Sequence, residues 1–172
     1  MGISFNANEI FEMAEQIERN GSSFYRRVAK SFKDANSCQK LLDLAAMEDE
    51  HERIFHAMRA DLSGQEGVVS GFDPSGEAAL YLQAIADSEV FDVRKDPTER
   101  LTGKESLEEI LLMAIGIEKD SIIFYQGIKE MVPERLGKDR VEAIIKEEMG
   151  HIITLSKELA SLKILNSPGS LT

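Results

Sequence analysis

Two short segments each place a glutamate three positions before a histidine: EDEH at 48–51 and EMGH at 148–151. Residues three apart lie on the same face of an α-helix, so one helix can offer a carboxylate and an imidazole to a single site. Apolar residues continue each face in steps of three and four, which predicts that these faces point into a core. They are Leu41, Leu44, Phe55, Met58 and Leu62 around the first pair, and Val141, Ile144 and Leu155 around the second.

The two pairs belong to an internal repeat with an offset of 100 residues. AEQIERNGSSFY (14–25) aligns with AIGIEKDSIIFY (114–125), and the same offset superimposes the two Glu-x-x-His pairs without an insertion. Within the aligned segments Glu18 matches Glu118, and each lies in the middle of an apolar helical face. A repeat of this kind indicates two copies of one helical hairpin.

If the hairpins are antiparallel, six metal-capable side chains lie at the same depth of one core. They are Glu18, Glu48, His51, Glu118, Glu148 and His151. Four buried carboxylates would each cost several kcal/mol in a medium of low dielectric constant and would also repel one another. Two divalent cations would balance their charge, and neutral imidazoles would complete the ligand set. A glutamate from each of two helices and Glu-x-x-His from each of two others is the di-iron carboxylate pattern.

Helical periodicity dominates the remaining sequence, and we predict an all-α, ferritin-like four-helix bundle in a single domain over 1–172. Its helices are expected to start near Asn6, Gln39, Thr102 and Lys138. Glu9 and Glu105 lie in capping-box positions of the first and third helices. The third helix is expected to end before Pro133. The connection at 64–101, which contains a short helical stretch at 77–91, is too long for a tight turn. The predicted order is therefore an antiparallel hairpin (6–63), a crossover (64–101) and a second antiparallel hairpin (102–165).

Composition and charge argue against several classes of partner and location. The chain has 172 residues, 42% of them hydrophobic and 30% charged, with a net charge of −11. We therefore expect no nucleic-acid partner, because no basic cluster is present to neutralise phosphates. The single cysteine, Cys38, excludes an internal disulfide. No signal peptide or membrane span is recognisable, so a cytoplasmic location without membrane association is expected.

The motifs resemble those of the rubrerythrin-related branch of the ferritin-like superfamily. IERNGSSFY and MEDEH in the first half, with IEKDSIIFY and KEEMGH in the second, are similar to its helix motifs, and the resemblance extends over roughly 8–163. It implies two iron ions, with manganese or zinc as substitutes. By position, Glu18 and His51 would hold one ion and Glu118 and His151 the other, while Glu48 and Glu148 bridge them. It also implies hydrogen peroxide or dioxygen as the oxidant, an unidentified electron donor and a homodimer.

Two departures from that family affect the expected activity. Rubrerythrins carry a further carboxylate one helical turn after the third-helix glutamate, where this chain has Ser121. They also carry a rubredoxin-type domain with four cysteines, which this sequence does not contain. The six-ligand pattern is closer to the ferroxidase centre of ferritin and bacterioferritin.

Several residues near the motifs have two interpretations. Tyr25 and Tyr125, seven positions after Glu18 and Glu118, could support the ligands or donate electrons, or they could be core tyrosines with satisfied hydroxyls. Gly21 could allow substrate or backbone to approach Glu18. His56 is expected on the surface, as are three acidic residues next to the ligands, namely Asp49, Glu50 and Glu147. Met13, Met47, Met58 and Met113 are expected to fill the core.

Three functions are compatible with this pattern. The first is a di-iron oxidoreductase that oxidises Fe(II) or reduces peroxide or dioxygen. The second is a module that stores or transfers iron without turnover. The third is a metal-free structural bundle.

Overall fold

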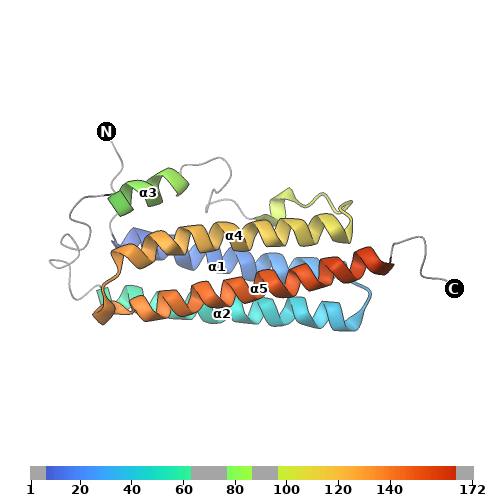
Figure 1. The fold of residues 1–172 in the computed structure, drawn as a ribbon, viewed down its shortest axis with the longest axis horizontal. Helices are drawn as coiled ribbons and strands as arrows, with labels where there is room; N and C mark the ends of the chain where they lie inside the picture. Colours follow the sequence, from blue (N-terminus) through green and yellow to red (C-terminus); the bar gives the residue numbers. More distant parts are fainter. Residues whose placement is uncertain (1–6, 63–76, 87–96, 166–172) are drawn as a thin grey trace.

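Four long helices lie side by side in the computed structural model (Figure 1). They are α1 (Ala7–Ala29), α2 (Ala35–Leu62), α4 (Leu107–Met131) and α5 (Lys138–Leu165). The structure describes residues 7–62, 77–86 and 97–165. These ranges also contain α3 (Glu77–Ala86) and two 3-10 helices (Pro97–Arg100 and Glu134–Leu136), and they hold no β-strand.

The order of the helices confirms the ferritin-like bundle. The helix α1 packs along α2 and α4 packs along α5, while α2 also contacts α5 and α1 contacts α4. Because α2 ends and α4 begins at opposite ends of the bundle, their connection has to travel its full length (Figure 1). Within that connection α3 packs on α4, and Pro97–Arg100 packs on α1.

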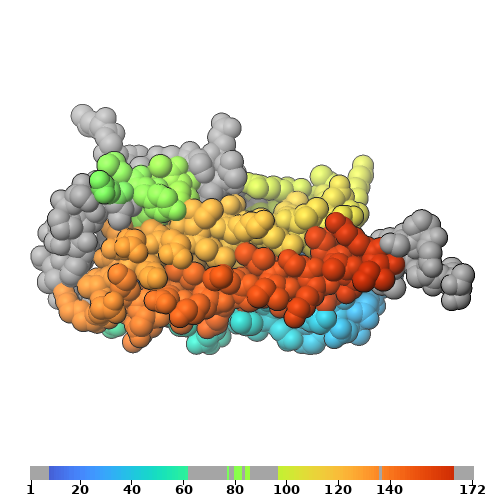
Figure 2. All heavy atoms as spheres, in the orientation of Figure 1, coloured from blue at the N-terminus to red at the C-terminus, as the bar shows by residue number. Residues whose placement is uncertain are grey.

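The crossover helix covers one end of α4 (Figure 2). Leu82 of α3 is fully buried there, and the Tyr81 hydroxyl donates a hydrogen bond of 3.0 Å to the Ile123 carbonyl. Gly127 of α4 makes this approach possible, since a Cβ atom at that position would lie 2.6 Å from Leu82. Several predicted helix boundaries lie outside the described residues. They are the cap at Asn6, the stop signals after residues 62 and 166, and the end of the crossover helix at residue 91.

The predicted start of α4 was wrong by five residues. Glu105 does accept hydrogen bonds from the Thr102 backbone (2.5 Å) and hydroxyl (2.6 Å), as a capping pair would. Gly103, however, has a φ of +79°, which is incompatible with a right-handed helix, so these bonds close a turn instead. The capping box that starts α4 is formed by Ser106 and Glu109.

The start of α2 was also misplaced, by four residues. The side chain of Asp34 accepts a hydrogen bond of 2.8 Å from the Ser37 backbone, which allows the helix to begin at Ala35 rather than near Gln39. The end of α4 was predicted correctly, because the helix stops at Met131, shortly before Pro133. The helix α5 begins at Lys138, also as predicted.

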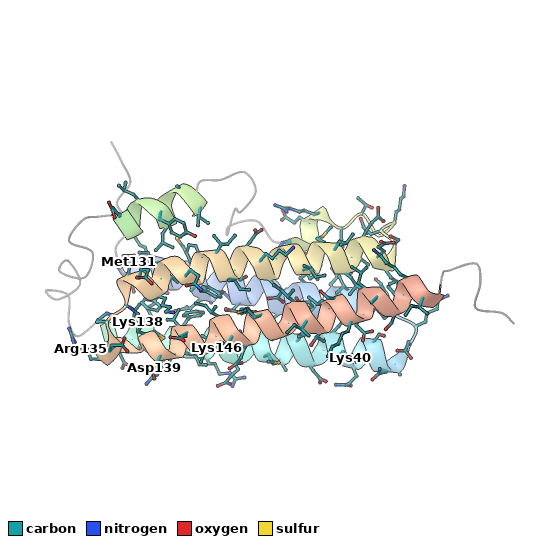
Figure 3. All side chains as sticks on the ribbon, in the orientation of Figure 1. Lys40, Met131, Arg135, Lys138, Asp139 and Lys146 are labelled. Atoms are coloured by element: carbon teal, nitrogen blue, oxygen red, sulfur yellow. The ribbon has the colours of Figure 1, made fainter. Side chains whose placement is uncertain are left out.

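Asp139 and Lys146 are among the charged side chains on the outside of the bundle (Figure 3). Lys138 and Arg135 lie where α4 turns into α5, and Lys40 lies towards the other end. Lys40 forms an ion pair with Glu158 that joins α2 to α5. None of the helices in the described ranges combines the length and apolar character needed to cross a membrane.

The apolar core consists of two clusters, one towards each end of the bundle. One contains Phe11, Phe55, Met58, Ile128 and Val141 among its buried members, and the other contains Phe24, Val28, Leu41, Leu111 and Leu155. Polar residues occupy the level between them on every long helix. Met13 and Met113 pack against the clusters as expected, whereas Met47 is 37% exposed and does not fill the core.

Candidate metal centre

The level between the two apolar clusters holds the six side chains that the repeat singles out. Each exposes 3% or less of its surface. The helix α1 supplies Glu18, α2 supplies Glu48 and His51, α4 supplies Glu118, and α5 supplies Glu148 and His151. All six groups expected to converge are therefore brought together from four different helices.

Two of the glutamates lie between the imidazoles. Glu148 directs Oε1 to His51 Nδ1 (3.1 Å) and Oε2 to His151 Nδ1 (2.9 Å). Glu48 also contacts both imidazoles, with Oε2 3.6 Å from His51 Nδ1 and Oε1 3.2 Å from His151 Nδ1. The imidazole rings are nearly parallel, at 20°, with centroids 5.8 Å apart. This is the arrangement that two bridging carboxylates require.

The other two glutamates each approach one imidazole. Glu18 lies 3.6 Å from His51 Nδ1, and Glu118 lies 3.4 Å from His151 Nδ1. The structure therefore contains two overlapping groups of four ligand atoms, each group lying within 4.8 Å. They are Glu18, Glu48, His51 and Glu148 in one group, and Glu48, Glu118, Glu148 and His151 in the other.

The two tyrosines support these terminal glutamates crosswise. The Tyr25 hydroxyl of α1 donates a hydrogen bond to Glu118 Oε1 of α4, and the Tyr125 hydroxyl of α4 donates to Glu18 Oε1 of α1. Burial raises the pKa of both phenols well above the ordinary value, and the neighbouring carboxylates raise it further. The phenols therefore remain protonated donors, and they connect the two halves of the repeat.

The residues one turn after the terminal glutamates differ between the halves. A Cβ atom at Gly21 would lie 3.4 Å from Cγ and Cδ of Glu48. A side chain at position 21 would therefore pack directly against Glu48. At the equivalent position the Ser121 hydroxyl donates a hydrogen bond to the Ile117 carbonyl (3.1 Å) within its own helix.

Burial and mutual repulsion divide the carboxylates into two kinds. Burial raises the pKa of Glu18 and Glu118 well above the ordinary value, and the charge of Glu48 raises it further. The pKa values of Glu48 and Glu148 are instead lowered, because close contacts outweigh burial. For Glu48 these are contacts with Glu18 and both imidazoles, and for Glu148 they are chiefly contacts with both imidazoles. Without cations, the two terminal carboxyls therefore hold a proton more readily than the two central ones.

The imidazoles are protonated in the same metal-free state. Burial opposes their positive charge, but close contacts with the surrounding carboxylates outweigh it and raise the pKa of His151 to about 12. The pKa of His51 is raised for the same reason. The two imidazolium groups then offset part of the negative charge of the four carboxylates.

The hydrogen bonding of the cluster is incomplete. Within the part of the chain that the structure describes, six buried side-chain atoms have no hydrogen-bond partner: Glu48 Oε1, both oxygens of Glu148, Nδ1 of His51, and both ring nitrogens of His151. Buried polar groups are normally satisfied, so such a concentration needs a specific explanation. Carboxylate oxygens and imidazole nitrogens that face one another without bonding are suitable ligands for divalent cations. The residues present therefore fit a dinuclear metal centre.

One acidic residue beside the cluster is exposed as predicted but also contacts a proposed ligand. Glu147 is 48% exposed, as a solvated residue would be, yet its Oε2 lies 3.0 Å from Nε2 of His51. No sequence signal indicates this contact, because it depends on how α5 lies against α2. Asp49 also has a structural role, accepting a hydrogen bond of 2.6 Å from Ser22 of α1. Glu50 and His56 are exposed as predicted.

One buried carboxylate went unnoticed in the sequence. Glu15 is 4% exposed and lies 3.4 Å from Arg59 and 3.5 Å from His56 Nδ1. It belongs to an ion-pair network between α1 and α2 away from the cluster, because Arg59 also reaches Glu12 (2.9 Å). The network satisfies the carboxylate and stabilises this hairpin.

The proton content of the cluster gives a measurable expectation. Binding two divalent cations at pH 7 should release at least about two protons per chain, one from each imidazolium, and the raised pKa of Glu18 and Glu118 adds to this number. Since cations compete with these protons, their apparent affinity should increase with pH. Calorimetry with Zn²⁺ in buffers of different ionisation enthalpy measures the number. Groups with ordinary pKa values would release less than about one proton, which would contradict this electrostatic description.

Comparison with known proteins agrees with this geometry. A crystal structure of a Thermotoga maritima protein assigned as a ferritin-like diiron-carboxylate protein is similar, with 27% sequence identity and a TM-score of 0.66. The similarity covers 93% of this chain and 98% of that one. No match is found among curated proteins. The sequence pattern of the rubrerythrin family matches residues 9–159, a range that includes all six clustered side chains, so the chain belongs to the rubrerythrin family.

Proposed function

We propose that the bundle binds two iron ions at mid-length and uses them for oxidation–reduction chemistry. One ion is held by Glu18 and His51, the other by Glu118 and His151, and Glu48 and Glu148 bridge the pair. The oxygen and imidazole donors, without a thiolate, suit iron or manganese, and zinc is an acceptable substitute.

One observation supports this proposal above all. Buried carboxylate and imidazole atoms of α2 and α5 face one another and, among the described residues, have no hydrogen-bond partners. Glu18 of α1 and Glu118 of α4 complete the set, and each accepts a hydrogen bond from one tyrosine. Two divalent cations would satisfy these atoms and match the charge of four carboxylates. A structural bundle gains nothing from this arrangement, because hydrophobic residues of similar volume would cost less free energy to bury.

The reaction we propose is oxidation of Fe(II), or reduction of hydrogen peroxide or dioxygen by the reduced centre. Bound iron supplies reversible one-electron chemistry towards such small oxidants. The protein positions the donors, excludes bulk water with its two apolar clusters, and keeps protons on Tyr25 and Tyr125 beside the terminal carboxylates. The electron donor of the cycle is an unidentified partner, and the expected homodimer remains a prediction.

Iron storage or transfer without turnover is the alternative on the same residues. Storage would require uptake beyond the two positions that the cluster offers. Anaerobic loading with Fe(II), followed by oxygen or peroxide, separates these functions. Two ions per chain followed by rapid oxidation supports the oxidoreductase, whereas continued uptake well beyond two supports storage.

Removing individual ligands tests the assignment. We expect Glu48→Ala and His151→Ala each to lose at least one of the two ions, because the first removes a bridge and the second a terminal ligand. Metal analysis of the anaerobically loaded protein measures the loss.

His56→Ala is the matched control, because it removes an exposed histidine outside the cluster. It should load two ions. If Glu48→Ala and His151→Ala load as much iron as the parent, these residues are not ligands.

The tyrosines should matter through their hydrogen bonds to the terminal glutamates. Tyr25→Phe removes the donor to Glu118, and Tyr125→Phe removes the donor to Glu18. Loss of a group that orients a ligand typically lowers metal affinity by about 10–100-fold. Competition with a chelator should therefore show one weakened ion in each variant. Unchanged affinity in both variants would leave these tyrosines with a packing role only.

A further inference from the structure

The contacts made by Nδ1 of the two imidazoles are equivalent in the two halves of the repeat. Each imidazole directs Nδ1 towards the same two bridging glutamates and towards one terminal glutamate of its own. Each terminal glutamate accepts a hydrogen bond from the tyrosine of the other half. From these contacts alone, the two proposed ion positions would be equivalent.

The equivalence is lost at the outer nitrogens of the imidazoles. Nε2 of His51 lies 3.0 Å from Glu147 Oε2. Nε2 of His151 is buried and, among the described residues, has no hydrogen-bond partner. The repeat places Met47 at the position equivalent to Glu147. A thioether sulfur is only a weak acceptor, so Met47 offers no comparable bond.

This difference bears directly on metal binding. An imidazole that binds a cation through Nδ1 carries its proton on Nε2, and a carboxylate that accepts this N–H fixes the tautomer and the ring orientation. It also strengthens Nδ1 as an electron-pair donor. His51 has such a partner, from a different helix, and His151 does not.

We infer that Glu147 is a positioning residue that makes the two ion positions unequal. The position between Glu18 and His51 binds its cation more tightly and fills first, and the position between Glu118 and His151 fills second. The inference rests on the proposed function, since it concerns the same centre. It adds an order of filling and a residue outside the ligand set that determines it.

Exchanging the two residues tests this directly. Glu147→Met gives the second half the side chain of the first, and Met47→Glu does the reverse. Both positions are partly exposed, at 48% for the Glu147 side chain and 37% for Met47, so neither exchange disturbs the core. Glu147→Gln keeps the shape and an accepting oxygen, so it should fall between the parent and Glu147→Met. Circular dichroism melting verifies folding in each case.

The probe is Co²⁺, titrated anaerobically against a chelator and followed by visible absorption. In a His151→Ala background, where His51 is the remaining imidazole, Glu147→Met should weaken Co²⁺ binding by about 10–100-fold. In a His51→Ala background the same change should alter affinity by less than about twofold, because Glu147 then has no imidazole to orient. Met47→Glu should tighten binding in that second background.

The spectrum gives an independent readout of the filling order. The parent with one equivalent of Co²⁺ should match the spectrum of His151→Ala rather than that of His51→Ala. Glu50→Met is the charge control, because it removes an exposed carboxylate from α2 without touching either imidazole, and it should leave both affinities unchanged.

The outcomes separate the inference from the proposed function. A parent that binds two Co²⁺ ions, with Glu147→Met either without effect or weakening both positions equally, overturns the inference and leaves the dinuclear centre intact. An effect of Glu50→Met as large as that of Glu147→Met also overturns it, because charge alone would then be responsible. A parent that binds no Co²⁺ in the core overturns both.

Discussion

Four carboxylates buried in the middle of an apolar bundle are the constraint on which the rest of the structure depends. Their charge has to be balanced, and the fold provides for this in two ways. In the metal-free state protons contribute, because the pKa is raised on both imidazoles and on Glu18 and Glu118. In the proposed loaded state two cations replace these protons, and the cluster is neutral.

The long helices serve this constraint by fixing depth and direction. Each contributes its polar residues at mid-length, between apolar residues that form a cluster on either side. The antiparallel pairing of α1 with α2 and of α4 with α5 brings residues far apart in sequence to one level. Hydrogen bonds from Tyr25 and Tyr125 then connect the hairpins to each other. The cluster is thus held by helices and not by loops, which favours a rigid ligand geometry.

The two halves of the chain are related by sequence, but they are not interchangeable. Glu48 packs against Gly21, whereas the equivalent helical turn of α4 carries Ser121, bonded to its own backbone. Glu147 reaches His51, whereas the equivalent residue is Met47. A duplicated hairpin therefore surrounds a symmetric set of donors with unequal surroundings, which gives each proposed ion position its own chemistry.

The sequence predicted the fold class and the convergence of the six side chains because both depend on periodicity. Faces with apolar residues three and four apart have to be buried, and the offset of 100 residues places the glutamates and histidines at equal depth. Helix starts were harder to predict, since Thr102 and Ser106 both precede a glutamate by three residues. Only the backbone at Gly103 distinguishes a turn from a helix start.

Contacts between hairpins were not predictable from one sequence. The approach of Glu147 to His51 and the crossed tyrosine bonds depend on how α1 and α2 lie against α4 and α5, and no local pattern encodes that geometry. Glu147 is exposed as predicted, but a half-exposed carboxylate can still reach a buried imidazole. The family resemblance helped with the ligands but not with these supporting contacts.

A crystal structure of the anaerobically Fe(II)-loaded protein, with anomalous scattering measured at the iron edge, tests the central claim most directly. The account predicts two peaks at mid-length inside the bundle, one beside Glu18 and His51 and one beside Glu118 and His151, with Glu48 and Glu148 between them. Peaks confined to surface carboxylates, with the six buried side chains bonded only to one another, would contradict it.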